Sequence, residues 1–152
     1  VGRVRDLPGG RRKSREILFR VLYEAELGGE EPRELLDYAL GRYHLTEDGR
    51  DYAVRVLERR EAERAEIDER IRVRLANWEM HRLSPVVRTI LRLAVAELRE
   101  PSEVPARVVL DQAIELAKRY GEEGSDAFVN GVLDPIAFAL RPAELSPRRN
   151  GA

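Results

Sequence analysis

The fold of this chain is decided by the stretch Glu115-Leu116-Ala117-Lys118-Arg119-Tyr120-Gly121, followed after three residues by Ser125-Asp126-Ala127-Phe128-Val129-Asn130-Gly131-Val132-Leu133-Asp134. It predicts the end of one helix, a glycine-containing turn and the start of a second helix. Gly121 is the expected C-terminal stop. Ser125 is the expected N-cap, because its hydroxyl can accept a hydrogen bond from an N–H of the first helical turn.

The second of these helices carries two further signals. Pro135 is expected to kink the helix, or to restart it with Asp134 as the cap, because proline offers no N–H to the preceding turn. Gly131 is expected to allow another helix to pack closely, because glycine has no Cβ. Both residues therefore predict a helix that adapts to its neighbours.

Helical signals extend toward the N-terminus of the chain. A stripe of 3.6-residue period predicts a first helix, formed by Ile17, Leu18, Val21, Leu22 and Ala25. Gly28-Gly29 separates it from a second helix that opens at Pro32. Thr46 is the expected N-cap of a long helical stretch, which is either one helix or two with a break near residues 60–63. Trp78 continues the apolar face of that stretch and is expected to be a core anchor.

A central helix is expected after Ser84-Pro85, which supplies an N-cap followed by proline at the first helical position. It is apolar nearly all round and ends before Pro101. Val104-Pro105 starts the next helix. Since neither a strand pattern nor an internal repeat competes, we expect an all-α fold of about seven helices in one compact domain.

Composition excludes several classes of protein. The chain has 152 residues, of which 43% are hydrophobic and 36% charged, and it contains no cysteine. This is about one domain's worth of chain with enough apolar residues for a core. The lack of cysteine excludes disulfides and thiolate metal sites, which is compatible with a cytoplasmic location. The sequence has no run of about 18 apolar residues, so we expect no membrane span. The first ten residues lack the apolar region of a secretory signal.

A net charge of −1 conceals a polarised chain. Residues 1–20 contain seven basic residues against Asp6 and Glu16, whereas residues 21–48 contain eight acids against two arginines. Such asymmetry marks either a nucleic-acid-binding segment or a solvated tail. We expect a helical domain over residues 11–141, a flexible N-terminal arm over residues 1–10 and a flexible C-terminal tail over residues 142–152.

Catalysis has little support in the sequence. His44 and His81 lie far apart, and neither a metal-binding histidine pair nor a Gly-rich phosphate loop is present. Acidic pairs such as Glu63 and Glu66 fall in an arginine-rich segment and suit ion pairs on a helix surface. We therefore expect no enzymatic activity, no cofactor and no metal.

The first helix is the best candidate for a binding site. Its helical spacing places Arg12, Arg15, Phe19 and Tyr23 on one face. Guanidinium groups bind phosphates, and aromatic rings stack on the unpaired bases of single-stranded RNA. Alternatively, Glu16 pairs with Arg12 and Arg20, and the aromatic rings belong to the edge of the core. Spacing alone leaves both interpretations open.

Separated blocks of this sequence resemble the NusB family of transcription antitermination factors. The resemblance runs from about Arg11 to Asp134, and it rests on the stretch quoted above and on Arg11-Arg12-Lys13-Ser14-Arg15, Val21-Leu22-Tyr23, Asn77-Trp78, Ile90-Leu91-Arg92-Leu93-Ala94, Glu97-Leu98 and Val104-Pro105. It implies two three-helix subdomains. It also implies an RNA-binding site, which comprises Arg11, Arg12, Lys13, Arg15, Tyr23, Arg92 and Phe128.

Two of these site residues have alternative interpretations. Arg92 either extends the RNA surface or forms internal salt bridges with Glu97 or Asp111. Phe128 is expected in the first turn of the last helix, either at the surface shared by RNA and a partner, which we favour, or as a core anchor.

The resemblance further implies partners and a mechanism. They are boxA-type single-stranded RNA, the ribosomal protein NusE and an antitermination complex on RNA polymerase, notably during ribosomal RNA synthesis. The mechanism implied is tethering, without bond making or breaking. Two alternatives remain: an RNA-binding domain fragment of a ribosomal RNA methyltransferase, and a structural helical homodimer that masks its own arginines.

Overall fold

The computed structural model describes residues 10–76, 78–101 and 104–145. These residues form seven α-helices and one short 3-10 helix, without a strand among them. The elements are α2 (Arg11–Gly28), α3 (Pro32–Arg42), α4 (Glu47–Ala62), α5 (Arg64–Arg72), η2 (Met80–Arg82), α6 (Pro85–Arg99), α7 (Ala106–Tyr120) and α8 (Ser125–Leu140). The expected all-α fold is confirmed.

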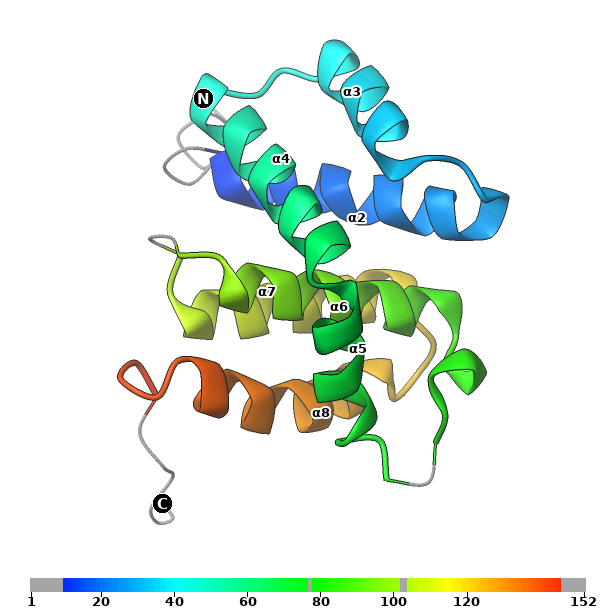
Figure 1. Cartoon of the computed structure of the whole chain (residues 1–152), viewed down its shortest axis with the longest axis vertical. Coiled ribbons are helices and arrows are strands. Elements are labelled where there is room, and N and C mark those ends of the chain that lie inside the picture. The colour runs from blue at the N-terminus through cyan, green and yellow to red at the C-terminus, as the bar shows by residue number, and fades with distance from the viewer. Residues whose placement is uncertain (1–9, 77, 102–103, 146–152) are drawn as a thin grey trace.

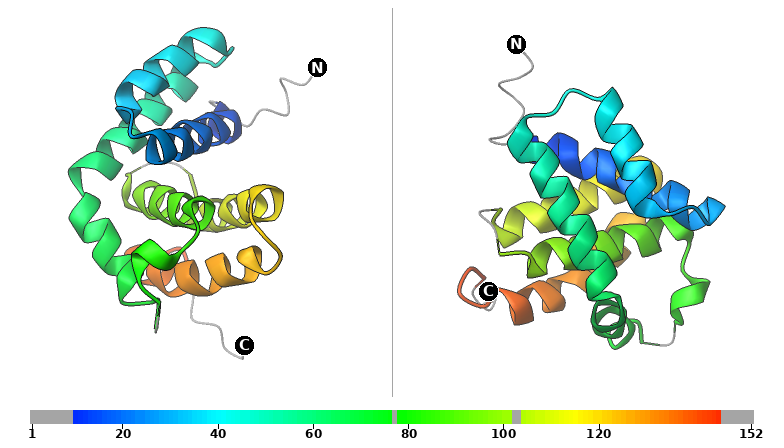
Figure 2. Two further views of the ribbon diagram at one scale, coloured as in Figure 1. Left: turned by 90° about the vertical axis from the view of Figure 1, so that its right-hand side faces the viewer. Right: turned by 45° about the horizontal axis from the view of Figure 1, so that its top comes forward.

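The helices form two groups of three that pack on each other (Figure 1). Helices α2, α3 and α4 form the first group, and α6, α7 and α8 form the second. The continuous run of α4 and α5 crosses from the first group to the second, where α5 contacts α6 and α8 (Figure 2). This arrangement confirms the two three-helix subdomains that the resemblance implied.

Helix α6 is the centre of the molecule. Eleven of its 15 residues are buried, including Glu97 and Arg92. Its neighbours come from both groups, since α2 and α4 pack on one side and α7 and α8 on the other. Burial all round explains why the sequence of α6 is apolar on nearly every face.

The predicted helix starts are confirmed where local capping chemistry determines them. Thr46 Oγ1 accepts a hydrogen bond of 2.9 Å from the Gly49 N–H, and Ser84 Oγ accepts one of 3.2 Å from the Val87 N–H. Pro32 lies in the first turn of α3. These caps satisfy N–H groups that have no partner inside their own helix.

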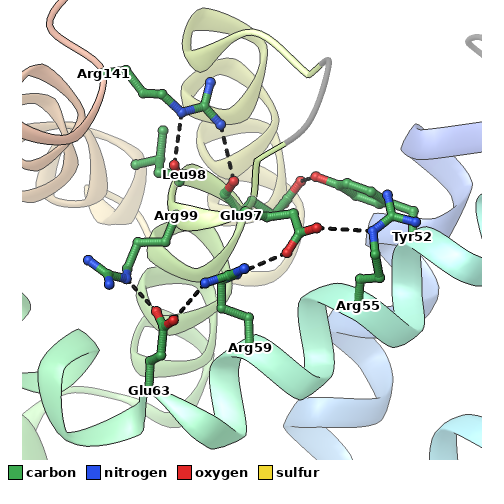
Figure 3. Close-up of polar contacts among 9 residues, drawn as sticks. Tyr52, Arg55, Arg59, Glu63, Glu97, Leu98, Arg99 and Arg141 are labelled. Atoms are coloured by element: carbon green, nitrogen blue, oxygen red, sulfur yellow. Dashed lines mark hydrogen bonds and ion pairs between the residues drawn. The ribbon is translucent and has the colours of Figure 1, made fainter.

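The long stretch after Thr46 is divided into α4 and α5 at Glu63, as the two-helix alternative predicted. The charged face around this break points toward α6, where ion pairs take the place of apolar contacts. Figure 3 shows Glu63 between Arg59 and Arg99, with Arg59 also reaching a carboxylate of α6. That carboxylate belongs to Glu100, which is 5% exposed.

The turn between α7 and α8 differs from the prediction. The N-cap of α8 is Gly124, which has φ 91°, and Ser125 is the first helical residue, so the predicted Ser125 cap is wrong. Gly124 takes this position because a residue at positive φ is best tolerated when it has no Cβ. Gly121 does end α7 as predicted, and a Cβ on it would lie 2.8 Å from the side chain of Ser125.

Helix α8 runs from Ser125 to Leu140 with Pro135 inside it, so the alternative of a restart at Asp134 is wrong. Its apolar face is held in the core by Val132, Leu133 and Ile136, which offset the hydrogen bond that proline cannot donate. Gly131 is exposed and a Cβ on it would meet no atom within 4 Å, so the predicted close packing there is wrong.

Trp78 is 50% exposed, and the prediction that it anchors the core is wrong. Helix α5 ends at Arg72, so the helical period that carries Ile71 into the core no longer applies at residue 78. Trp78 lies in the connection to η2, where the Arg82 guanidinium carbon is 5.5 Å from the ring centroid. Leu75, three residues before Trp78, is buried.

The predicted N-terminal arm lies outside the described residues except for Gly10. The predicted C-terminal tail lies outside them beyond Leu145. The tail's first residues are packed against the domain, because Leu145 is buried and Glu144 Oε1 accepts a 2.7 Å hydrogen bond from the Ala106 N–H. Over the part of the chain that the structure describes, no helix is long and apolar enough to cross a membrane.

Candidate nucleic-acid interface

The first turn of α2 divides its basic residues into an inner and an outer pair. Arg11 and Arg15 are buried, with 4% and 3% exposed, whereas Arg12 and Lys13 are exposed. Residues four apart lie on the same side of a helix, so Arg11 and Arg15 both face the core, whereas Arg12 and Lys13 between them face solvent. The run predicted as one RNA-binding surface therefore has two different environments.

Arg15 is bound in a buried cluster with two residues from other helices. Its Nε and Nη2 atoms donate three hydrogen bonds of 2.7–2.9 Å to the carboxylate of Glu97 in α6. The hydroxyl of Tyr52, on α4, donates another of 2.7 Å to the same carboxylate. Figure 3 shows the contact of Tyr52 with Glu97. The cluster joins α2, α4 and α6 at the interface of the two subdomains.

Burial controls the ionisation of this cluster. Burial, together with the neighbouring Glu97 carboxylate, raises the pKa of Tyr52 well above its ordinary value, so the phenol stays protonated and donates. Burial alone would lower the pKa of Arg15, but the Glu97 carboxylate outweighs it and the pKa is raised. The Arg15 guanidinium and the Tyr52 phenol thus both keep their protons at physiological pH.

Arg11 is held by α4. Its Nη1 lies 3.1 Å from the Asp48 carboxylate, and its guanidinium carbon lies 4.5 Å from the centroid of the Tyr52 ring. Between the two inner arginines, Ser14 Oγ lies 2.8 Å from the carbonyl oxygens of both Gly10 and Gly49. These contacts fix the start of α2 against α4.

The outer pair lies on an exposed basic surface shared with α7. Arg12, Lys13 and Arg20 of α2 are exposed, as are Lys118 and Arg119 at the end of α7. Within the described part of the chain, no carboxylate pairs with Arg12 or Lys13. Glu16 lies 2.8 Å from Arg119 and 3.3 Å from Arg20, so the alternative that Glu16 pairs with Arg20 is confirmed, whereas no pair with Arg12 forms.

A row of three aromatic rings supports this surface. Phe19 stacks on Tyr23 at a centroid distance of 5.9 Å and packs against the tilted ring of Tyr120 at 5.0 Å. Phe19 is only 2% exposed, so it is a core residue, whereas Tyr23 and Tyr120 are half-buried. The Tyr120 hydroxyl accepts a 3.1 Å hydrogen bond from Arg20. Of these three rings, the two tyrosines have surface available to a ligand.

The other two predicted site residues, Arg92 and Phe128, make contacts within the protein itself. Arg92 is 8% exposed and pairs with Asp68 at 2.8 Å and with Glu26 at 3.5 Å, so its internal salt bridges exist but with different acids from Glu97 or Asp111. Phe128, in the first turn of α8, is half-buried and packs against the core. Its ring therefore lies partly in the core and partly at the surface.

Sequence reasoning missed Glu97 and Tyr52 as partners of Arg15, and Arg119 and Tyr120 as members of the basic surface. The run Lys118-Arg119-Tyr120 combines charge and an aromatic ring at a helix end, and this signal could have identified the second pair. No local sequence signal marks Glu97 and Tyr52 as partners of Arg15. Among the described residues, no group of three metal-ligating side chains comes together, and His44 and His81 are both exposed.

Comparisons with known proteins agree with this arrangement. The sequence model of the NusB family matches residues 12–138. The transcription antitermination protein NusB of Pseudothermotoga lettingae is 40% identical over 136 residues, which cover 88% of this chain and 95% of the relative. A solved structure of NusB from T. maritima is 38% identical with a TM-score of 0.77, covering 84% of this chain and 89% of the other.

A crystal structure of the antitermination factors NusB and NusE in complex with dsRNA is also similar. It is 34% identical to this chain, with a TM-score of 0.76, and the match covers 85% of this chain and 96% of that chain. These three matches each span most of both molecules.

Proposed function

Because this chain belongs to the NusB family, we propose that it is a transcription antitermination factor that binds RNA through the exposed basic surface of α2 and α7. The RNA is single-stranded and of the boxA type, notably in ribosomal RNA transcripts. The partner is the ribosomal protein NusE, and the two assemble on RNA polymerase. The proposed place of action is the bacterial cytoplasm, where transcription occurs.

The observation that carries this proposal is the exposure of Arg12 and Lys13 beside a fixed inner pair. Arg11 and Arg15 hold α2 in place, so the two outer cations project from a rigid helix. Cations on a rigid support bind phosphates with a smaller cost in side-chain freedom. The neighbouring Tyr23 and Tyr120 rings offer stacking surfaces for unpaired bases.

The proposed role of NusE is to supply sequence selectivity. A solved relative of this chain is found with NusE and RNA together. A short basic helix has few groups that read base edges, so a second protein beside the same strand adds the missing contacts. Phe128 is the residue we propose for the surface where both ligands meet. The proposed mode of action is tethering, in which no bond is made or broken.

The test is the affinity of the purified chain for boxA RNA, measured by fluorescence anisotropy at several salt concentrations, with and without NusE. The double variant R12A/K13A removes the two outer cations. The slope of log K against log salt should become shallower by about 0.7 for each phosphate that the variant no longer neutralises. Since coupling of two ligands is reciprocal and typically about 1–3 kcal/mol, saturating NusE should tighten RNA binding by roughly five-fold or more.

A control variant and a variant of Phe128 make the result specific. The variant R72A/R74A also removes two exposed arginines, at the end of α5 on the far side of the molecule from α2 (Figure 1). It should leave the salt slope unchanged. The variant F128A should weaken RNA binding more in the presence of NusE than in its absence. Equal RNA affinity of the wild type and R12A/K13A would contradict the proposed surface.

A further inference from the structure

A groove of about 560 Å³ lies between α2 and α3, next to the side of α2 that faces α7, since Glu16 and Arg20 line the groove and also contact the Tyr120 hydroxyl. Its floor is apolar and is formed by Ile17, Val21, Leu35 and Ala39. Its rim is different, because it combines basic and aromatic side chains from both helices. An apolar floor with a charged rim is a common design of ligand-binding sites.

The aromatic part of the rim comes from α3. Tyr38 is 66% exposed and Tyr43, directly after the helix, is 42% exposed. Arg42 donates a 2.9 Å hydrogen bond to the Tyr38 hydroxyl, and its guanidinium carbon lies 5.6 Å from the ring centroid. The Tyr38 ring is thus held in place while most of its surface faces solvent. Exposed aromatic rings of this kind serve binding more than folding.

The charged part of the rim favours an anionic ligand. Lys13, Arg20 and Arg42 line the groove together with the acids Glu16 and Glu24. Glu16 is already engaged by Arg119 and Arg20, at 2.8 and 3.3 Å. The lining thus has three cations against two carboxylates, a surplus of one positive charge, and Glu16 is further shared with Arg119 of α7.

We propose that this groove binds single-stranded RNA as a continuation of the strand held by the outer face of α2. This inference rests on the proposed function and extends it to a second surface. Lys13 belongs to both surfaces, so one strand can pass from Arg12 across Lys13 into the groove without leaving basic surface. Tyr38 and Tyr43 stack on bases, and Arg20 and Arg42 contact phosphates.

The groove has room for a short stretch of RNA. Along α2 it extends from Lys13 to Glu24, which at 1.5 Å per residue is about 16 Å. Bases stacked at about 3.4 Å along one strand would fit about five nucleotides into that length. The strand bound by this chain is accordingly longer than the part that contacts the first turn of α2.

The test compares a boxA RNA with the same RNA extended by about five nucleotides at either end. The extended RNA should bind the wild type more tightly. The variant Y38A/Y43A should lose that gain, by at least about five-fold for each stacked base, while its affinity for the short RNA stays at the wild-type value. The matched variant Y38F/Y43F keeps both rings and should keep the gain. Thermal melts confirm that both variants are folded.

Each of the other possible outcomes would contradict one or both proposals. Equal binding of short and extended RNA by the wild type, or an unchanged gain in Y38A/Y43A, overturns the proposal. So does a selective loss of NusE affinity in Y38A/Y43A, which would assign the groove to a protein. If the short RNA fails to bind but the extended one binds in a tyrosine-dependent way, the groove stands and the proposed α2 surface falls. If neither RNA binds, both proposals fall.

Discussion

Arg15 and Glu97 lie 82 positions apart in the sequence and form a bidentate ion pair with side chains that are each 2% exposed. The pair joins α2 to the central helix α6. A family signature that looks like a run of RNA-binding arginines is therefore in part a structural element of the subdomain interface.

We predict that R15A lowers the free energy of unfolding by about 3–5 kcal/mol, because it leaves the Glu97 carboxylate buried without its cation. E97Q should also destabilise the protein. In the double variant R15A/E97Q the two effects should not add, since the buried charge is gone. Urea denaturation of the four proteins measures this coupling. Additive effects would show that the pair is not an energetic unit.

Gly121, at the end of α7, and Gly131, inside α8, should respond in opposite ways to alanine. A Cβ at Gly121 would lie 2.8 Å from the Ala117 carbonyl oxygen and from the Ser125 side chain. G121A should therefore destabilise the protein by about 1–3 kcal/mol. G131A places its methyl group in open space on the helix α8, so it should stabilise by about 0.5–1 kcal/mol. Thermal melts compare them, and equal shifts would refute the packing argument.

Trp78 is the only tryptophan of the chain, so its fluorescence reports a single site. We predict emission typical of a solvent-exposed indole and efficient quenching by iodide. W78A should cost less than about 2 kcal/mol of stability, because half of the ring surface never leaves water. F19A, which removes a ring that is 2% exposed, should cost about 3–5 kcal/mol. A larger destabilisation by W78A than by F19A would contradict the structure.

Two glutamates link stability to acid pH. The hydrogen bond from Arg99 lowers the pKa of Glu63, and the Ala106 N–H lowers the pKa of Glu144. A depressed pKa means that the stabilisation is complete above the ordinary value of 4.5 and disappears as the pH falls through the lower folded-state value. The wild type should thus become less stable below about pH 4.5. E63Q and E144Q should each flatten that decline, as measured by urea denaturation at a series of pH values.

Much of the fold could be predicted because its signals are local. Thr46, Ser84 and Pro32 act through residues within one helical turn, so a single sequence contains the whole interaction. The position of α6 at the centre could also be predicted, because burial on all sides requires an apolar sequence on all faces.

The site could be predicted less well, because burial of a charged residue depends on a distant partner. Nothing near Arg15 indicates that Glu97 and Tyr52 enclose it. The prediction for Trp78 is wrong for a related reason. The helical period ends at Arg72, and tertiary packing determines which of the residues after it are buried. The N-cap of α8 is Gly124 rather than Ser125, because a glycine at positive φ begins the helix one residue earlier.

The ion pair between residues 15 and 97 also limits how relatives of this chain can recombine. A crossover anywhere between the two positions would combine the first helix of one parent with the central helix of another. If only one parent supplied the arginine or the glutamate, the hybrid would bury a lone charge and fail to accumulate. Chimeric proteins with junctions in this interval should therefore survive only when both positions come from compatible parents.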